Sequence, residues 1–160
     1  MDAIQRNVAW KAIPVAAIVA GTVFLAMMMI LNPIMYGIDS MFILRYFGSI
    51  GMGSDVLVES TTTAMVVGVL VHYLLSLVFT LVISIVVHRW GMIVGIVGGG
   101  LLGLAIYAIN FYTMTFFFEW MFAIQSVLLV ITHIVFGAVA GGVYEALDTY
   151  DEPIGGEVVA

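Results

Sequence analysis

This sequence contains no cysteine, which excludes disulfide bonds, thiolate-held metals and iron–sulfur clusters ligated by this chain alone. It also has only four lysine and arginine residues against ten aspartate and glutamate residues, a net charge of -6. A nucleic-acid backbone is bound through clustered positive charge, so we expect no DNA or RNA partner. Any function must therefore depend on side chains other than cysteine or clustered lysine and arginine.

Charged residues are missing altogether from four long stretches of the chain. These stretches lie between Lys11 and Asp39, Glu59 and Arg89, Arg89 and Glu119, and Glu119 and Glu145. A helix crosses a ~30 Å hydrocarbon core with about 20 residues, so each stretch is long enough to span a bilayer. The 64% share of apolar residues and the mean hydropathy of +1.22 are also typical of an integral membrane protein.

We therefore predict an all-α fold, an integral membrane four-helix bundle that occupies residues 1–147. The predicted spans are about 14–31, 64–87, 92–111 and 120–144. Residues 148–160 form an acidic C-terminal tail, which we expect to be solvated. Because the spans and short connections leave no room for a soluble catalytic domain, we expect that the protein is not an enzyme.

The connection between the first two spans is the longest one, and its centre at residues 40–48 is apolar. Such a segment is too apolar for a free loop and too short to cross a bilayer. We predict an interfacial helix there, which either caps the bundle or acts as a lid or docking surface.

The few basic residues predict the orientation in the membrane. Arg6, Lys11 and Arg89 would share one side of a four-span protein, against Arg45 alone on the other. Positively charged residues favour the cytoplasmic side, so both termini are expected in the cytoplasm.

Repeated polar residues suggest an internal duplication. Asn32 and Asn110 lie 78 residues apart at matching places in spans one and three, and His72 and His133 lie 61 residues apart in spans two and four. We interpret the chain as two tandem helical hairpins, related by an axis along the membrane normal. The two histidines would then lie at similar depth on helices that run in the same direction.

Ionisable residues inside a membrane are costly, so His72 and His133 are the candidate functional residues. Three interpretations remain open. The imidazoles are neutral hydrogen-bonding groups between helices, the axial ligands of a haem b cofactor, or part of a proton or small-solute pathway.

Small residues recur every fourth position along several predicted spans and let helix backbones approach closely. The predicted packing residues are Gly68, Ser76, Gly91, Gly95, Gly99, Gly103, Gly137 and Gly141. They predict a tightly packed bundle and disfavour a wide aqueous pore.

Three motifs point to a known family: the sequence HYLLS that begins at His72, a glycine-rich third span after Trp90 and Gly91, and the run THIVFGAVAGGVY at 132–144. Over roughly residues 12–147 the chain resembles the small four-span YagU-like membrane proteins of prokaryotes. This resemblance implies that the protein lies in the cytoplasmic (inner) membrane of a prokaryote. It tells more about the architecture of the protein than about its activity.

The leading functional hypothesis is a non-catalytic accessory or structural subunit of a larger membrane complex, of the respiratory or photosynthetic kind. Its partners would be other integral membrane proteins and lipid, or a second copy of the chain in a homo-oligomer. A haem b electron-transfer module and a small-solute or proton conduit are the alternatives.

Overall fold

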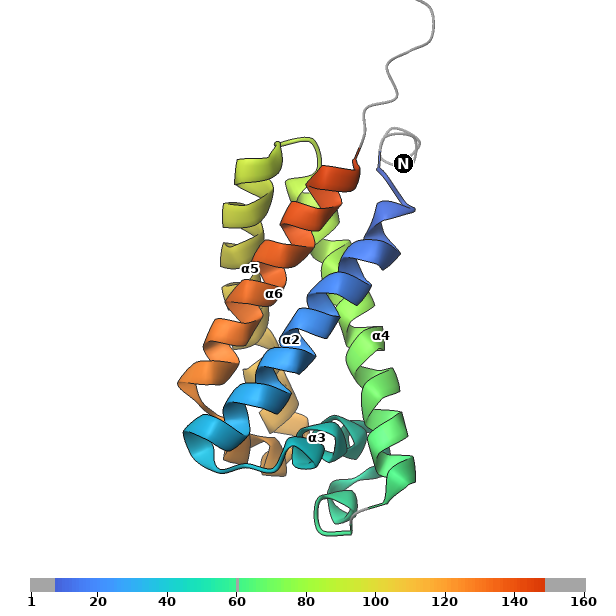
Figure 1. Cartoon of the computed structure of the whole chain (residues 1–160), viewed down its shortest axis with the longest axis vertical. Helices are drawn as coiled ribbons and strands as arrows, with labels where there is room; N and C mark the ends of the chain where they lie inside the picture. The colour runs from blue at the N-terminus through green and yellow to red at the C-terminus, as the bar shows by residue number, and fades with distance from the viewer. Residues whose placement is uncertain (1–7, 60, 149–160) are drawn as a thin grey trace, which may run out of the picture.

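The structure, a computed structural model, describes residues 8–59 and 61–148. Its elements are α2 (Ala12–Tyr36), α3 (Ser40–Met52), the short 3-10 helix η1 (Ser54–Leu57), α4 (Thr62–Val87), α5 (Met92–Phe117), the 3-10 helix η2 (Glu119–Ile124) and α6 (Val127–Leu147). Helices α2, α4, α5 and α6 are long and apolar enough to cross a membrane (Figure 1). The prediction of an all-α protein with four spans and a short helix between the first two is confirmed.

The largest differences from the predicted bounds lie at the ends of α2 and α5 and at the start of α6. Helix α2 continues past residue 31 to Tyr36 and ends where Gly37, at φ 67°, donates its N–H to the Pro33 carbonyl. Helix α5 continues past residue 111 to Phe117. The predicted start of the fourth span at residue 120 is wrong, because Ser126 caps α6 by accepting a hydrogen bond from the Leu129 N–H at 3.2 Å.

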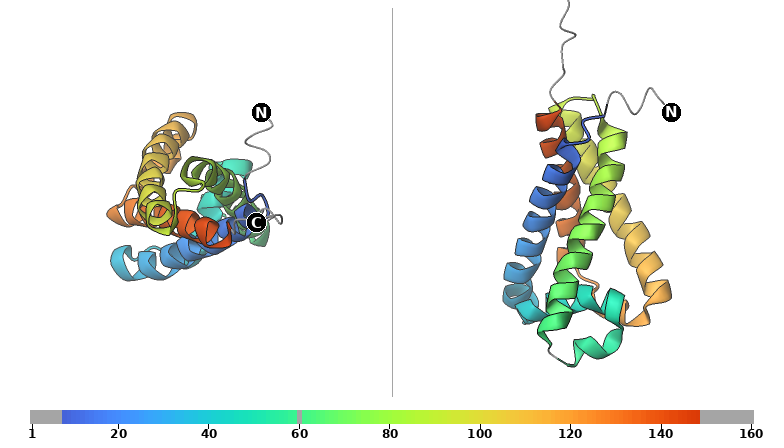
Figure 2. Two further views of the ribbon diagram at one scale, coloured as in Figure 1. Left: turned by 90° about the horizontal axis from the view of Figure 1, so that it is seen from above. Right: turned by 90° about the vertical axis from the view of Figure 1, so that its right-hand side faces the viewer.

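The four long helices are not packed evenly. Helices α5 and α6 make the most extensive interface, and α2 lies across both α6 and α4. Helices α4 and α5 contact each other little, and Figure 2 shows them spreading apart toward the end of the bundle that holds α3. In two equivalent hairpins the α2–α6 and α5–α4 interfaces would correspond, but α2 contacts α6 far more than α5 contacts α4. The internal duplication stays a prediction.

Close backbone contact explains the glycines of the α5–α6 interface. A Cβ atom at Gly99 would overlap the Gly137 carbonyl oxygen, and one at Gly103 would overlap the His133 carbonyl oxygen. From the other side, a Cβ at Gly141 would overlap the Gly95 carbonyl oxygen. Only glycine permits this approach of two helices.

Gly91 has a different role from the one predicted for it. It precedes α5 with φ 86°, and apart from its two chain neighbours no residue has a heavy atom within 4 Å of where its Cβ would be. Its N–H donates to the Glu145 carboxylate at 2.9 Å. The prediction that Gly91 packs helices together is therefore wrong; glycine suits this position because of the positive φ.

Helix α3 packs against α4 through a second pair of glycines. A Cβ at Gly68 would overlap the Leu44 carbonyl oxygen, and one at Gly48 would overlap the Ala64 carbonyl oxygen. The helix runs to Met52, beyond the predicted 40–48. It closes the end of the bundle where α4 and α5 diverge (Figure 1).

Candidate functional site: a histidine-lined cavity

The two predicted histidines meet at one residue of α2. The ring centroid of Phe24 lies 5.5 Å from that of His72 on α4 and 5.0 Å from that of His133 on α6. Phe47 of α3 lies 5.0 Å from His72, and Tyr107 of α5 lies 5.4 Å from His133. Helix packing thus brings both imidazoles into one aromatic cluster.

Each imidazole uses one nitrogen to bind a backbone carbonyl. His72 Nε2 lies 2.9 Å from the Gly21 oxygen on α2, and His133 Nδ1 lies 2.7 Å from the Leu129 oxygen on its own helix. A carbonyl oxygen only accepts, so each of these nitrogens carries the proton. His72 therefore joins two helices, as the first interpretation expects, whereas His133 does not.

Both histidines line a cavity of about 80 Å³. Its walls come from α2, α3, α4, α5, η2 and α6 and are almost wholly apolar, with side chains such as Met28, Phe79 and Phe136. The polar lining is supplied by the two imidazoles together with Tyr46, Ser76 and Asn110. This cavity is the candidate functional site.

Helix α3 and η2 close the cavity at one end. Tyr46 is buried and donates its hydroxyl to the Met121 carbonyl at 2.9 Å, and Trp120 Nε1 donates to Ser49 Oγ at 3.1 Å. Burial raises the pKa of Tyr46 above its ordinary value, so its phenol remains a neutral donor. The interfacial helix therefore forms the floor of the site.

A haem b does not fit this cavity. An apolar cavity of ~150 Å³ is known to accept benzene, whereas this one measures about 80 Å³. Phe24, which is 5% exposed, also fills the space against both imidazoles. His72 and His133 are therefore not placed to be the axial ligands of a macrocycle.

Buried polar residues continue along α4 from His72 toward the end of the bundle that holds the described termini. Ser76 Oγ donates to the His72 carbonyl at 2.8 Å and packs against Gly21. Further along, the buried hydroxyls of Thr80 and Ser84 have no hydrogen-bond partner within the described residues. Within the described residues no hydrogen bond joins the hydroxyls of Ser76, Thr80 and Ser84 to one another, so these groups form no continuous proton path by themselves.

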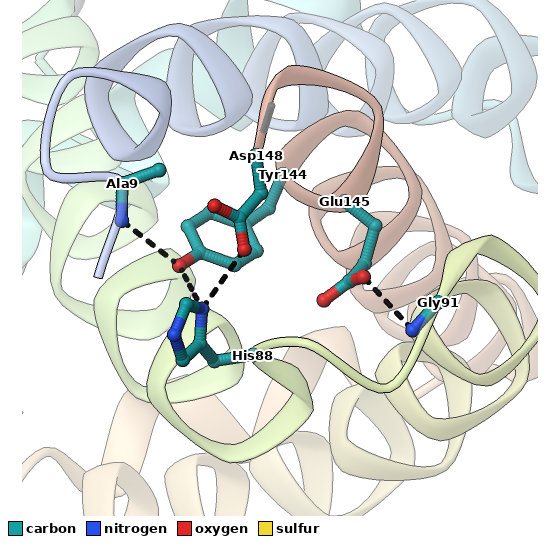
Figure 3. A network of polar contacts seen from close by, with 6 residues as sticks. All are labelled: Ala9, His88, Gly91, Tyr144, Glu145 and Asp148. Carbon is teal, nitrogen blue, oxygen red and sulfur yellow. Dashed lines mark hydrogen bonds and ion pairs between the residues drawn. The ribbon is translucent and has the colours of Figure 1, made fainter. Parts of the chain in front are cut away.

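A second polar cluster lies at the end of the bundle where both described ends meet (Figure 3). His88 Nδ1 lies 2.8 Å from the Tyr144 hydroxyl and 2.9 Å from the Asp148 carboxylate. The Ala9 N–H donates to the same hydroxyl at 3.3 Å. These contacts join the start of α2, the end of α4 and the end of α6.

The sequence did not reveal this cluster. Tyr144 and Asp148 are four residues apart, so they share one helix face, and that spacing is the signal that could have linked them. Their contact with His88 depends on how the α4–α5 turn approaches α6, which the sequence does not indicate.

Changing Tyr144 to phenylalanine is expected to lower the free energy of unfolding by about 1–2 kcal/mol. The change removes the hydroxyl that bonds to Ala9 and His88, and Tyr144 is fully buried. The measurement is equilibrium unfolding in detergent micelles by added dodecyl sulfate. Tyr112→Phe is the matched control, because Tyr112 is 67% exposed; equal losses from both variants would contradict a structural role for the cluster.

Within the described part of the chain, no three histidine, aspartate or glutamate residues are grouped so that they could hold a metal ion. No protein-family model matches this chain, and neither a curated protein nor a solved structure is significantly similar to it. The resemblance to YagU-like proteins therefore stays a prediction.

Proposed function

We propose that this protein is a non-catalytic accessory subunit of a larger membrane assembly of the respiratory or photosynthetic kind. Its partners would be other integral membrane proteins. The observation that carries the proposal is that α5 packs extensively against only one of the other spans, α6, and contacts α4 little.

The free side of α5 lies opposite its glycines. Ile93, Val97 and Leu101 lie one turn apart and are 79%, 58% and 66% exposed. Each lies two residues from a glycine of the α6 interface, which at ~100° per residue places it on the other side of the helix. A partner span that packs along this row would give α5 a second neighbour without disturbing α6.

The proposed location is the cytoplasmic membrane of a prokaryote, with both termini in the cytoplasm. The first and last described residues lie at the same end of the bundle (Figure 1). Lys11 and Arg89 belong to that end, whereas Arg45 lies in α3 at the other. The side with more basic residues is the cytoplasmic one by the positive-inside rule.

The proposal is tested by gentle solubilisation of native membranes followed by native electrophoresis of the full chain. The expected result is migration with a larger assembly of other proteins. Val97→Trp should reduce this association by about tenfold or more, a loss equivalent to ~1.4 kcal/mol. Leu70→Trp, at a 65% exposed position of α4, is the matched control and should leave the association unchanged. A free monomer, or particles built only from copies of this chain, would contradict the proposal.

A further inference from the structure

The histidine-lined cavity opens sideways between α4 and α5. Leu75 and Phe79 of α4, and Asn110 and Met114 of α5, line the cavity and are only partly buried. These helices contact each other little. The open side of the cavity therefore lies on the flank of the bundle.

This opening faces hydrocarbon rather than water. Leu75 lies halfway along the 26-residue helix α4, which is about 39 Å long at the usual rise per residue. Asn110 lies seven residues before the end of α5, about 10 Å along the helix axis. A molecule that enters through the opening must come from the lipid phase.

The cavity also presents hydrogen-bond acceptors. Since His72 Nε2 and His133 Nδ1 face carbonyl oxygens, the other nitrogen of each neutral imidazole is an acceptor. Neither His72 Nδ1 nor His133 Nε2 has a hydrogen-bond partner among residues 8–59 and 61–148. An acceptor without a partner is costly in apolar surroundings, and this cavity is almost wholly apolar, so these nitrogens favour an occupant that donates a hydrogen bond.

The volume limits what this occupant can be. At about 80 Å³ the cavity is smaller than the ~150 Å³ that accept benzene, so it excludes ring systems. A hydroxyl group and the first few carbons of an unbranched chain are narrower than a ring system. The rest of such a chain would leave through the opening and lie among the lipid tails.

We propose that this cavity binds a single-chain lipid that ends in a hydroxyl group. The hydroxyl donates to His133 Nε2 or His72 Nδ1, and the chain passes between Leu75 and Met114 into the hydrocarbon layer. This binding site goes beyond the proposed role as an accessory subunit and does not depend on it.

The test uses the full-length protein in phosphatidylcholine nanodiscs and hexadecanol that carries a photoreactive diazirine on its chain. We expect light-dependent adducts on Phe79 or Met114, mapped by mass spectrometry. Free hexadecanol should displace the probe about tenfold better than hexadecane, which is the size of effect that one buried hydrogen bond gives. His72→Phe and His133→Phe each keep an aromatic ring in the cluster but remove one acceptor, and the two changes together should abolish this preference.

Two neighbouring positions on α4 provide the matched control. Leu75→Trp narrows the opening and should reduce labelling of the cavity at least tenfold, while Leu74→Trp, at a 62% exposed position, should not. Equal competition by hexadecanol and hexadecane would overturn the proposal. So would adducts confined to outward-facing residues, or equal labelling of the two tryptophan variants.

Discussion

Replacing Gly99 with leucine is expected to force α5 away from α6 and to lower the free energy of unfolding by about 3 kcal/mol. Even a Cβ at this position would overlap the Gly137 carbonyl oxygen, and that oxygen belongs to a helix backbone that cannot rotate away. Because this is the most extensive interface in the bundle, its loss should affect the whole fold. The measurement is dodecyl sulfate unfolding in detergent micelles, with helix content as the signal.

Gly98 supplies the control on the adjacent position of the same helix. A Cβ there would meet only side-chain atoms of Val87 and Val94, at 3.7 and 3.8 Å, which are ordinary contacts. Gly98→Leu should therefore lower the free energy of unfolding by less than about 1 kcal/mol, because the added Cβ overlaps no backbone atom of another helix. Similar losses from the two variants would show that the glycines matter for reasons other than close helix contact.

Replacing Gly68 with valine is expected to displace α3 from α4, at a cost of about 2–3 kcal/mol. A Cβ at Gly68 would overlap the Leu44 carbonyl oxygen of α3. Because the chain has no native cysteine, Ser49→Cys can report on this displacement. Ser49 is fully buried on α3, and a cysteine at this position should react with a maleimide only when Gly68→Val has moved α3.

Gly51→Val is the matched control variant for this experiment. A Cβ at Gly51 would lie 3.5 Å from the nearest atom of the Val67 side chain, an ordinary contact on the same α3–α4 pair. The Ser49→Cys reporter should stay protected in this variant. If the Ser49→Cys reporter is equally protected from maleimide in the Gly68→Val variant, the close approach at Gly68 does not hold α3 in place.

The four spans could be predicted from the sequence because their physical cause is simple. A chain cannot bury charge in hydrocarbon at low cost, so the stretches without charge mark the spans. Helix ends were less predictable, as the fourth span shows. Residues 120–126 are mostly apolar, and hydropathy does not separate them from the helix that Ser126 caps.

The candidate site was predictable in part. Matching positions in spans two and four placed His72 and His133 at similar depth, and both contact Phe24 in the structure. The pattern did not indicate the aromatic ring that fills the space against them, which makes a haem unsuitable. Gly91 was misassigned because the spacing of small residues does not reveal a positive φ.

The cluster around His88 was not predicted because it depends on tertiary structure. Asp148 was assigned to the start of the acidic tail at 148–160, but it contacts His88 at 2.9 Å. The prediction that the tail is solvated falls on residues 149–160, which lie outside the described residues. Sequence periodicity describes one helix at a time, whereas this contact joins two helix ends.

The central claim is that the chain crosses the membrane four times, with α3 and η2 together on one side. Single cysteines at Asp55, Glu119 and Trp90 test it directly, because all three positions are exposed and the native chain has no cysteine. In intact cells, a membrane-impermeant maleimide should label Asp55→Cys and Glu119→Cys, and it should label Trp90→Cys only after permeabilisation. Labelling of positions 55 and 119 from opposite sides of the membrane would contradict the four-span fold.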